Sequence, residues 1–130
     1  MQLAYSQALT ILVVDLDIGY QLWLTELLID AGYRVLPALS ASQASALIAE
    51  CGVSVAVLVM NPNLNGTAEL ARSIRQDQSR LRVVAAVEAC AGDQVRPPEV
   101  DAVVVKPTPA SDLKALGDHL VNVILRLVSE

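Results

Sequence analysis

Short apolar runs alternate along this chain with longer segments in which apolar residues recur every three or four positions. The runs consist largely of valine, leucine and alanine, which is typical of strands buried on both faces of a parallel sheet. The sequence therefore predicts five such strands, at Thr10–Asp15, Tyr33–Leu36, Val53–Val59, Arg82–Val87 and Ala102–Val105.

The segments between the runs have the periodicity of amphipathic helices. We expect four helices, at Asp17–Ala31, Ala41–Glu50, Ala68–Gln78 and from Thr108 or Ser111 to about Val128. Ser40 and Thr67 are the expected caps of the second and third. Apolar spacing predicts that the first helix turns four residues toward the core, namely Leu24, Leu27, Leu28 and Ala31.

The connection between the fourth and fifth strands is unlike the others. The segment Glu88–Asp101 contains Gly92 and the adjacent pair Pro97 and Pro98. Two prolines remove two amide donors and disfavour helix at the residue before them. We expect a short turn or an irregular loop here, so the fourth helix is degenerate or missing.

Strand and helix alternate throughout, which requires right-handed crossovers with helices on both faces of the sheet. The predicted fold class is α/β, a flavodoxin-like, doubly wound five-stranded parallel sheet of order 2-1-3-4-5. Pro37 agrees with this order, because proline suits an edge strand and the second strand is an edge. Residues 1–9 are a short lead, and residues 10–130 form one domain.

Composition narrows the classes of function. The 130 residues are 54% hydrophobic, which suits a well-filled core, and carry a net charge of -5, which is poorly matched to nucleic acid. No apolar run is long enough to span a bilayer, and the first residues lack the basic start of a signal peptide. We therefore expect a cytoplasmic protein that binds neither membrane nor nucleic acid directly.

A few reactive residues stand apart from these patterns. Cys51 and Cys90 are too few for a disulfide framework or a metal cluster, and they are expected to be inert thiols, with a redox switch at Cys90 as the alternative. His119 has no evident orienting partner and is expected to be a surface residue. Asn65 and Gly66 predict a tight turn.

Four segments, in their order and spacing, resemble the receiver domain of two-component response regulators. They are ILVVDLD at Ile11–Asp17, LTELLIDAGY at Leu24–Tyr33, NPNLNG at Asn61–Gly66 and VVVKP at Val103–Pro107. The resemblance implies a pocket at the carboxyl ends of the strands. In that family the pocket holds two acids that bind Mg²⁺, an aspartate that accepts a phosphoryl group, a hydroxyl switch residue and a lysine.

The resemblance can be carried over one position at a time. Asp15 matches the first acid, Leu16 replaces the second, and the side chain of Asp17 is expected to point elsewhere. Counting back from Pro62 and Gly66 places Leu58 at the acceptor position. Val87 replaces the hydroxyl residue, Glu88 a small residue and Val103 a common switch aromatic, whereas Lys106 is retained. A shift of the third strand would bring Asn61 to the pocket instead.

Neither register supplies an acceptor, because no Asp or Glu occurs between Cys51 and Ala68. Leucine has no nucleophilic oxygen, and Asp15 alone offers too few oxygens for Mg²⁺. We therefore expect no catalytic residue, no cofactor and no metal, with Asp15 and Asp17 as vestiges. A buried lysine needs a partner, so we predict a Lys106–Asp15 contact, with a backbone carbonyl or solvent as the alternatives.

The last helix has more apolar residues than one core-facing stripe requires. The surplus is expected either to face a partner or to give extra cover to the core. The resemblance implies partner contacts through the final helices and the strand between them. The residues expected on such a partner face are Val103, Leu120, Ile124 and Leu127.

The sequence thus predicts a degenerate receiver, a pseudo-receiver, that regulates by protein contact or homodimerisation and without phosphorylation. It would stand alone or precede an output module, such as a transcription regulator. One alternative is a small-molecule-binding or enzymatic flavodoxin-like domain, although Asp15–Gly19 is not a glycine-rich phosphate loop. The other alternative is a receiver phosphorylated at another residue, such as Asp15.

Overall fold

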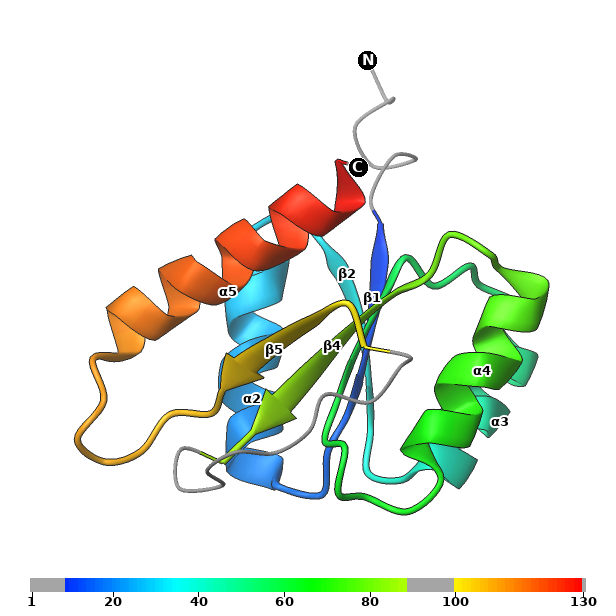
Figure 1. The fold of residues 1–130 in the computed structure, drawn as a ribbon, viewed down its shortest axis with the longest axis horizontal. Coiled ribbons are helices and arrows are strands. Elements are labelled where there is room, and N and C mark those ends of the chain that lie inside the picture. Colours follow the sequence, from blue (N-terminus) through cyan, green and yellow to red (C-terminus); the bar gives the residue numbers. More distant parts are fainter. Residues whose placement is uncertain (1–8, 89–99, 130) are drawn as a thin grey trace.

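The computed structural model describes residues 9–88 and 100–129. Five parallel strands pair in the order β2-β1-β3-β4-β5, which confirms the predicted flavodoxin-like sheet (Figure 1). Their bounds are β1 (Thr10–Val14), β2 (Arg34–Ala38), β3 (Val57–Met60), β4 (Arg82–Val87) and β5 (Ala102–Val105). The predicted irregular crossover before β5, with Cys90, Gly92, Pro97 and Pro98, falls largely outside the described residues.

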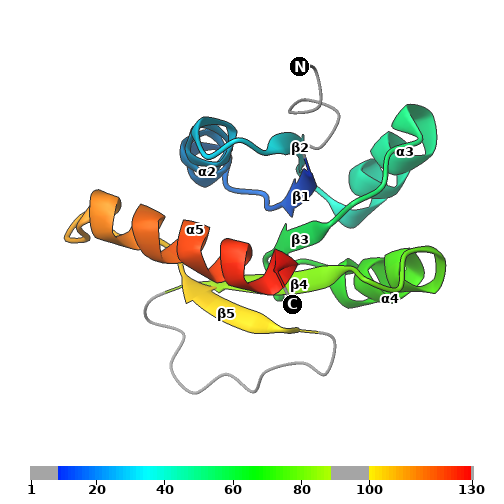
Figure 2. The same cartoon turned by 90° about the horizontal axis from the view of Figure 1, so that it is seen from above.

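Four helices cover the sheet within the described residues: α2 (Ile18–Asp30), α3 (Ala41–Cys51), α4 (Thr67–Asp77) and α5 (Leu113–Val128). Figure 2 shows α2 and α5 on one face of the sheet and α3 and α4 on the other. Two clusters of buried side chains fill the spaces between the sheet and these helix pairs. Because both faces of the inner strands β1, β3 and β4 are covered, these strands are largely apolar rather than alternating.

Local signals in the sequence set most helix ends. Ser40 caps α3 as predicted, its hydroxyl accepting from the amide of Gln43 at 3.0 Å. Asp17 and Asp112 cap α2 and α5 in the same way. The expected cap at Thr67 is wrong, because Gly66 is the N-cap and the Thr67 hydroxyl instead donates to the carbonyls of Leu64 and Asn61.

Three further expectations need correction. β3 begins at Val57 rather than Val53, because the amide of Val55 donates to the side chain of Gln78 at 2.6 Å. Pro37 lies within β2 rather than after it, which the unpaired outer edge of that strand permits. Ala31 is exposed, because α2 ends at Asp30 and the inward stripe ends with Leu28.

Candidate functional site at the carboxyl ends of the strands

Lys106 and Asp15 form a buried ion pair at the carboxyl edge of the sheet. Asp15 directly follows β1 and Lys106 directly follows β5, so two strands that are distant in sequence bring the pair together. The Lys106 Nζ lies 2.9 Å from the Asp15 Oδ2, and the two side chains are 4% and 3% exposed. This confirms the predicted Lys106–Asp15 contact.

Two further carboxylates and one aromatic ring surround the same ammonium. The Nζ of Lys106 lies 3.6 Å from the Glu88 Oε1 and 3.9 Å from the Asp17 Oδ2. It also lies 4.8 Å from the centre of the Tyr20 ring, a cation–π distance. Asp17 was expected to point elsewhere; it turns toward Lys106 because capping α2 holds its carboxylate at the first turn of that helix.

Backbone and side-chain hydrogen bonds hold Asp15 in place. Its Oδ1 accepts from the amide of Asp17 at 3.0 Å, which leaves Oδ2 for the lysine. The side-chain amide of Gln21 donates to the carbonyls of Asp15 and Ala38, so that α2 is tied to the ends of β1 and β2. Sequence reasoning missed Gln21, although its place on the inward face of an apolar helix was a signal for a buried polar anchor.

The register of β3 differs from the one expected at the acceptor position. Leu58 pairs with Leu12 inside the sheet and packs in the cluster under α3 and α4, away from Lys106. Met60 pairs with Val14, and the amide of Asn61 donates to the Val14 carbonyl at 3.1 Å. Asn61, not Leu58, therefore stands beside Asp15 at the end of its strand.

Asn61 uses its side chain locally. Its Oδ1 accepts from the amide of Asn63 at 2.9 Å, which closes a turn typical of asparagine. The prediction of Leu58 assumed the loop length of the receiver family between the strand and Pro62. β3 ends at Met60, one residue beyond the predicted Val59, and the residue that follows it is Asn61, three positions after Leu58.

The remaining pocket positions lie where the strands predict. Val87 ends β4, and its carbonyl accepts from the amide of Lys106 at 2.8 Å. Because valine has a hydrocarbon side chain, this position brings no hydroxyl to the edge. Leu16 is exposed to solvent. Burial, and after it the charges of Asp15 and Asp17, raise the pKa of Tyr20, so its phenol stays protonated beside the lysine.

These residues do not suit the Mg²⁺ ion that the fold family implies. Mg²⁺ requires several oxygen ligands in near-octahedral geometry. Here the carboxylates of Asp15, Asp17 and Glu88 already face one ammonium within 4 Å, and the Asn61 oxygen is engaged in its turn. Within residues 9–88 and 100–129, no three His, Cys, Asp or Glu side chains are arranged to hold a metal ion.

The prediction that Leu120, Ile124 and Leu127 form a partner face on α5 is wrong, because these side chains are buried or half-buried. Leu120 and Ile124 lie in the core beneath the helix, and Leu127 is half-buried against the same cluster. These residues recur every three or four positions and so form the inward stripe of α5. Val103 alone of the four is largely exposed. The large apolar residues that α5 exposes to solvent are Leu113 and Leu125.

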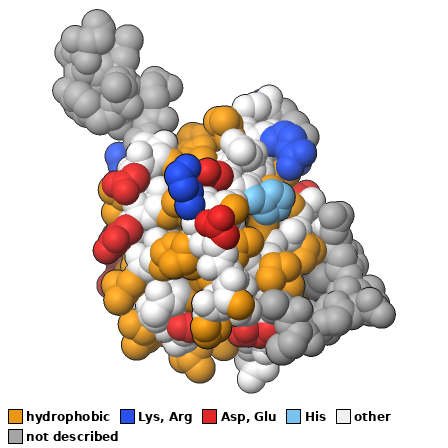
Figure 3. Space-filling view, turned by 90° about the vertical axis from the view of Figure 1, so that its left-hand side faces the viewer, with side chains coloured by type: hydrophobic (Ala, Val, Ile, Leu, Met, Phe, Trp, Pro, Cys, Tyr) orange, Lys and Arg blue, Asp and Glu red, His pale blue; other side chains and the backbone are white. Residues whose placement is uncertain are grey.

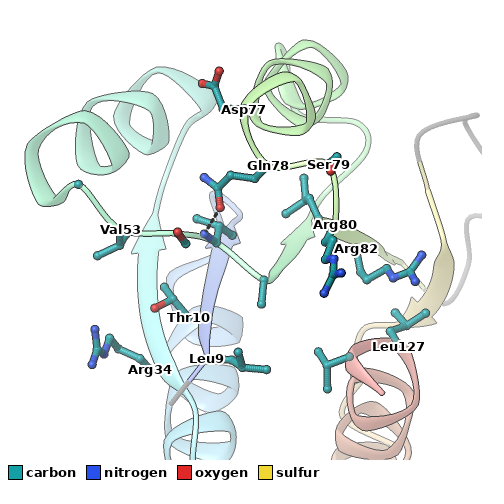
Figure 4. A pocket seen from close by; sticks show the side chains of 16 residues that line it. Leu9, Thr10, Arg34, Val53, Asp77, Gln78, Ser79, Arg80, Arg82 and Leu127 are labelled. Atoms are coloured by element: carbon teal, nitrogen blue, oxygen red, sulfur yellow. Dashed lines mark hydrogen bonds between the residues drawn. The ribbon is translucent and has the colours of Figure 1, made fainter. Parts of the chain in front are cut away.

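A hollow of about 1110 Å³ lies at the opposite, amino edge of the sheet. It is lined by the starts of β1, β2 and β4, including Arg34, Arg80 and Arg82. In Figure 4 the guanidinium groups of Arg34 and Arg80 lie on opposite sides of this hollow. They do not converge on one anion, so the carboxyl edge remains the candidate site.

No family model and no curated protein matches this chain. Solved receiver domains do match its structure. A CheY-like response regulator receiver domain from Methanospirillum hungatei aligns with a TM-score of 0.65 and 20% identity, covering 93% of this chain and 98% of its own. A response regulator receiver protein from Sinorhizobium medicae aligns at 0.71 with 20% identity, covering 95% and 97%.

Chemotaxis protein CheY4 from Vibrio cholerae aligns at 0.69 with 18% identity, covering 92% of this chain and 98% of its own. At these identities the likeness establishes the fold, and the chain has the receiver-domain fold over nearly its whole length. Among the described residues, no helix is long and apolar enough to cross a membrane.

Proposed function

We propose that this domain is a pseudo-receiver, a signalling module with the receiver fold that regulates through protein contact and without phosphorylation. The observation that carries the proposal is the surrounding of Lys106. Its ammonium lies among Asp15, Asp17 and Glu88, where the family's chemistry needs a divalent cation and a phosphoryl group. This ammonium is part of the chain and lies within 4 Å of all three carboxylates, so it competes with any divalent cation for them.

The end of β3 supports the same proposal. Asn61 stands beside Asp15 with an amide in place of a carboxylate, and an amide does not form an acyl phosphate as aspartate does. Asp15 itself is a poor acceptor, because both of its oxygens are already bonded, one to the Asp17 amide and one to Lys106. With no reaction to switch it, the domain acts by binding, alone or as part of a longer regulator.

The test is treatment of the pure chain with Mg²⁺ and acetyl phosphate, or with Mg²⁺ and beryllium fluoride. We expect no mass increase and an unchanged sedimentation coefficient, with an ordinary receiver domain as the positive control. A stoichiometric phospho-adduct on any residue, Asp15 included, would refute the proposal. So would a change of oligomeric state that depends on the phosphodonor.

A further inference from the structure

The outer side of α2 carries an exposed apolar seam. Ile18, Leu22 and Ile29 are 60%, 63% and 55% exposed, and Thr25 lies between them half-buried. These four positions are spaced by four, three and four residues, the spacing of a coiled-coil seam. At 100° per residue they fall within an arc of about 60° on one side of the helix.

The core of the domain does not need this seam. The opposite side of α2 already contributes Tyr20, Leu24 and Leu28 to the cluster under the sheet. Scattered single apolar residues on a surface are ordinary, but a row along one helix marks a contact surface. Figure 3 shows hydrophobic side chains together with acidic ones on the side of the molecule that α2 and α5 form. Leu16, also exposed, lies just before the seam.

The spacing of the seam indicates the shape of its occupant. A row at intervals of three and four residues presents holes into which the side chains of a second helix fit. A strand or a flat surface would match only part of it. The seam therefore suits one helix, packed along α2 over about three turns.

The charges beside the seam indicate the occupant's chemistry. Glu26 borders the seam and Asp30 follows it, whereas α2 contains no lysine or arginine. A second copy of α2 would bring only acids to face these acids, and the net charge of -5 opposes self-association further. An anionic lipid surface is disfavoured for the same reason. A helix with basic side chains at its rim would pair with Glu26.

We propose that the outer face of α2, made by Ile18, Leu22, Thr25 and Ile29, binds an amphipathic helix with a basic rim in a partner protein. This inference rests on the proposed function and gives the class of partner through which the domain acts. Docking there leaves the Lys106 site closed, because the buried side of α2 holds that site.

The probe is a fluorescein-labelled Leu/Lys amphipathic peptide that is helical in solution, with a Leu/Glu peptide of the same pattern as its counterpart. Fluorescence anisotropy with the full chain should show saturable binding of the Lys peptide and none of the Glu peptide. Leu22→Asp should weaken binding at least about tenfold, because it places a carboxylate in an apolar contact. Glu26→Lys should weaken the Lys peptide and admit the Glu peptide.

Leu125→Asp is the matched control, since Leu125 is 53% exposed against 63% for Leu22 but lies on α5, outside the seam. It should leave binding unchanged, and circular dichroism should show that all variants are folded. Equal loss in Leu125→Asp, unchanged binding in Leu22→Asp, or no binding of the Lys peptide would overturn the inference. So would a dimer of the chain alone that Leu22→Asp abolishes, because a second copy would then fill the seam.

The two proposals can fail separately. A phospho-adduct would remove the proposed function whatever the peptide does. If the Lys peptide does not bind and no phospho-adduct forms, only the proposal that the seam binds a basic helix is refuted.

Discussion

Lys106 is the residue on which the chemistry of the carboxyl edge depends. A buried ammonium loses much of its hydration, and hydrogen bonds and opposite charges must replace it. Asp15 supplies the closest contact, while Asp17 and Glu88 lie farther away and are more exposed to solvent. Most of the effect should therefore come from the Asp15 pair, because the exposed partners are screened by water.

Replacing Lys106 with methionine should lower the free energy of unfolding by about 3–5 kcal/mol, because Asp15 is left as an unpaired buried charge. Urea denaturation followed by circular dichroism measures this change. Lys114→Met is the control, since its pair with Asp118 is largely exposed and should contribute about 0.5 kcal/mol or less. Equal effects in the two variants would mean that water reaches Asp15.

Tyr20 gives a second prediction, about alkaline pH. Its pKa is raised above the ordinary 10.0 by burial and by the nearby acids, so the folded state holds a proton that the unfolded chain releases. Its contribution to stability is therefore complete below about pH 10 and decreases above it. Between neutral pH and about pH 11, the free energy of unfolding should fall by about 1 kcal/mol less in Tyr20→Phe than in the wild type, because phenylalanine has no proton to release. Parallel loss in both proteins would contradict the burial of the phenol.

The site was only partly predictable at the scale of single residues. Asp15 and Lys106 follow buried strands that must end at one edge, so their contact follows from topology. The place of Asn61 did not follow, because four consecutive apolar residues in β3 fit either register equally well. Pairing with β1 and β4 decides between them, and no local pattern records that pairing.

At the scale of elements, local bonds fix the loop between β3 and α4. Gly66 caps α4 with a φ of 84°, a left-handed conformation that glycine adopts without strain. The Thr67 hydroxyl and the Asn61 side chain bond to the backbone of the same loop. These bonds fix the path of the chain from the end of β3 to the start of α4.

Gly66→Ala should destabilise the domain by more than about 1 kcal/mol, because an L-residue is strained in the left-handed region. The added Cβ would also meet the Cβ of Ala41 at 3.1 Å, on the neighbouring helix α3. Gly52→Ala is the matched control, since its φ is 62° but nothing lies within 4 Å of its Cβ position. Thermal unfolding should show the larger loss for Gly66→Ala, and the reverse order would contradict the tight loop.

At the scale of the whole molecule, the fold was predictable from the alternation of runs and helices. Continuous apolar runs such as Val83–Ala86 require cover on both faces, which only a parallel sheet between two helix layers provides. The edge position of β2 followed from the flavodoxin-like strand order, and Pro37 agrees with it. The inward side of α5 did not follow, because apolar residues lie nearly all round that helix and only its packing selects Leu120 and Ile124.

The closed carboxyl edge predicts how the whole domain responds to Mg²⁺. A ligand that binds the folded state raises the midpoint of thermal unfolding, in proportion to the logarithm of its excess over Kd. Because the Lys106 ammonium is bonded to Asp15 and lies within 4 Å of Asp17 and Glu88, the midpoint should be the same in about 10 mM Mg²⁺ as in a chelator at matched ionic strength. A rise of several degrees with Mg²⁺ but not with Na⁺ would show that the acids can exchange their partner.

The two ends of the sheet differ in sign, and this has a kinetic consequence. Acidic side chains collect at the carboxyl edge, where Asp15, Asp17 and Glu88 lie, whereas Arg34, Arg80 and Arg82 line the amino edge. The domain is therefore an electric dipole aligned roughly with its strands. The field of an approaching cationic body exerts a torque on the domain before any contact forms, which turns the acidic end toward that body and raises the fraction of productive collisions.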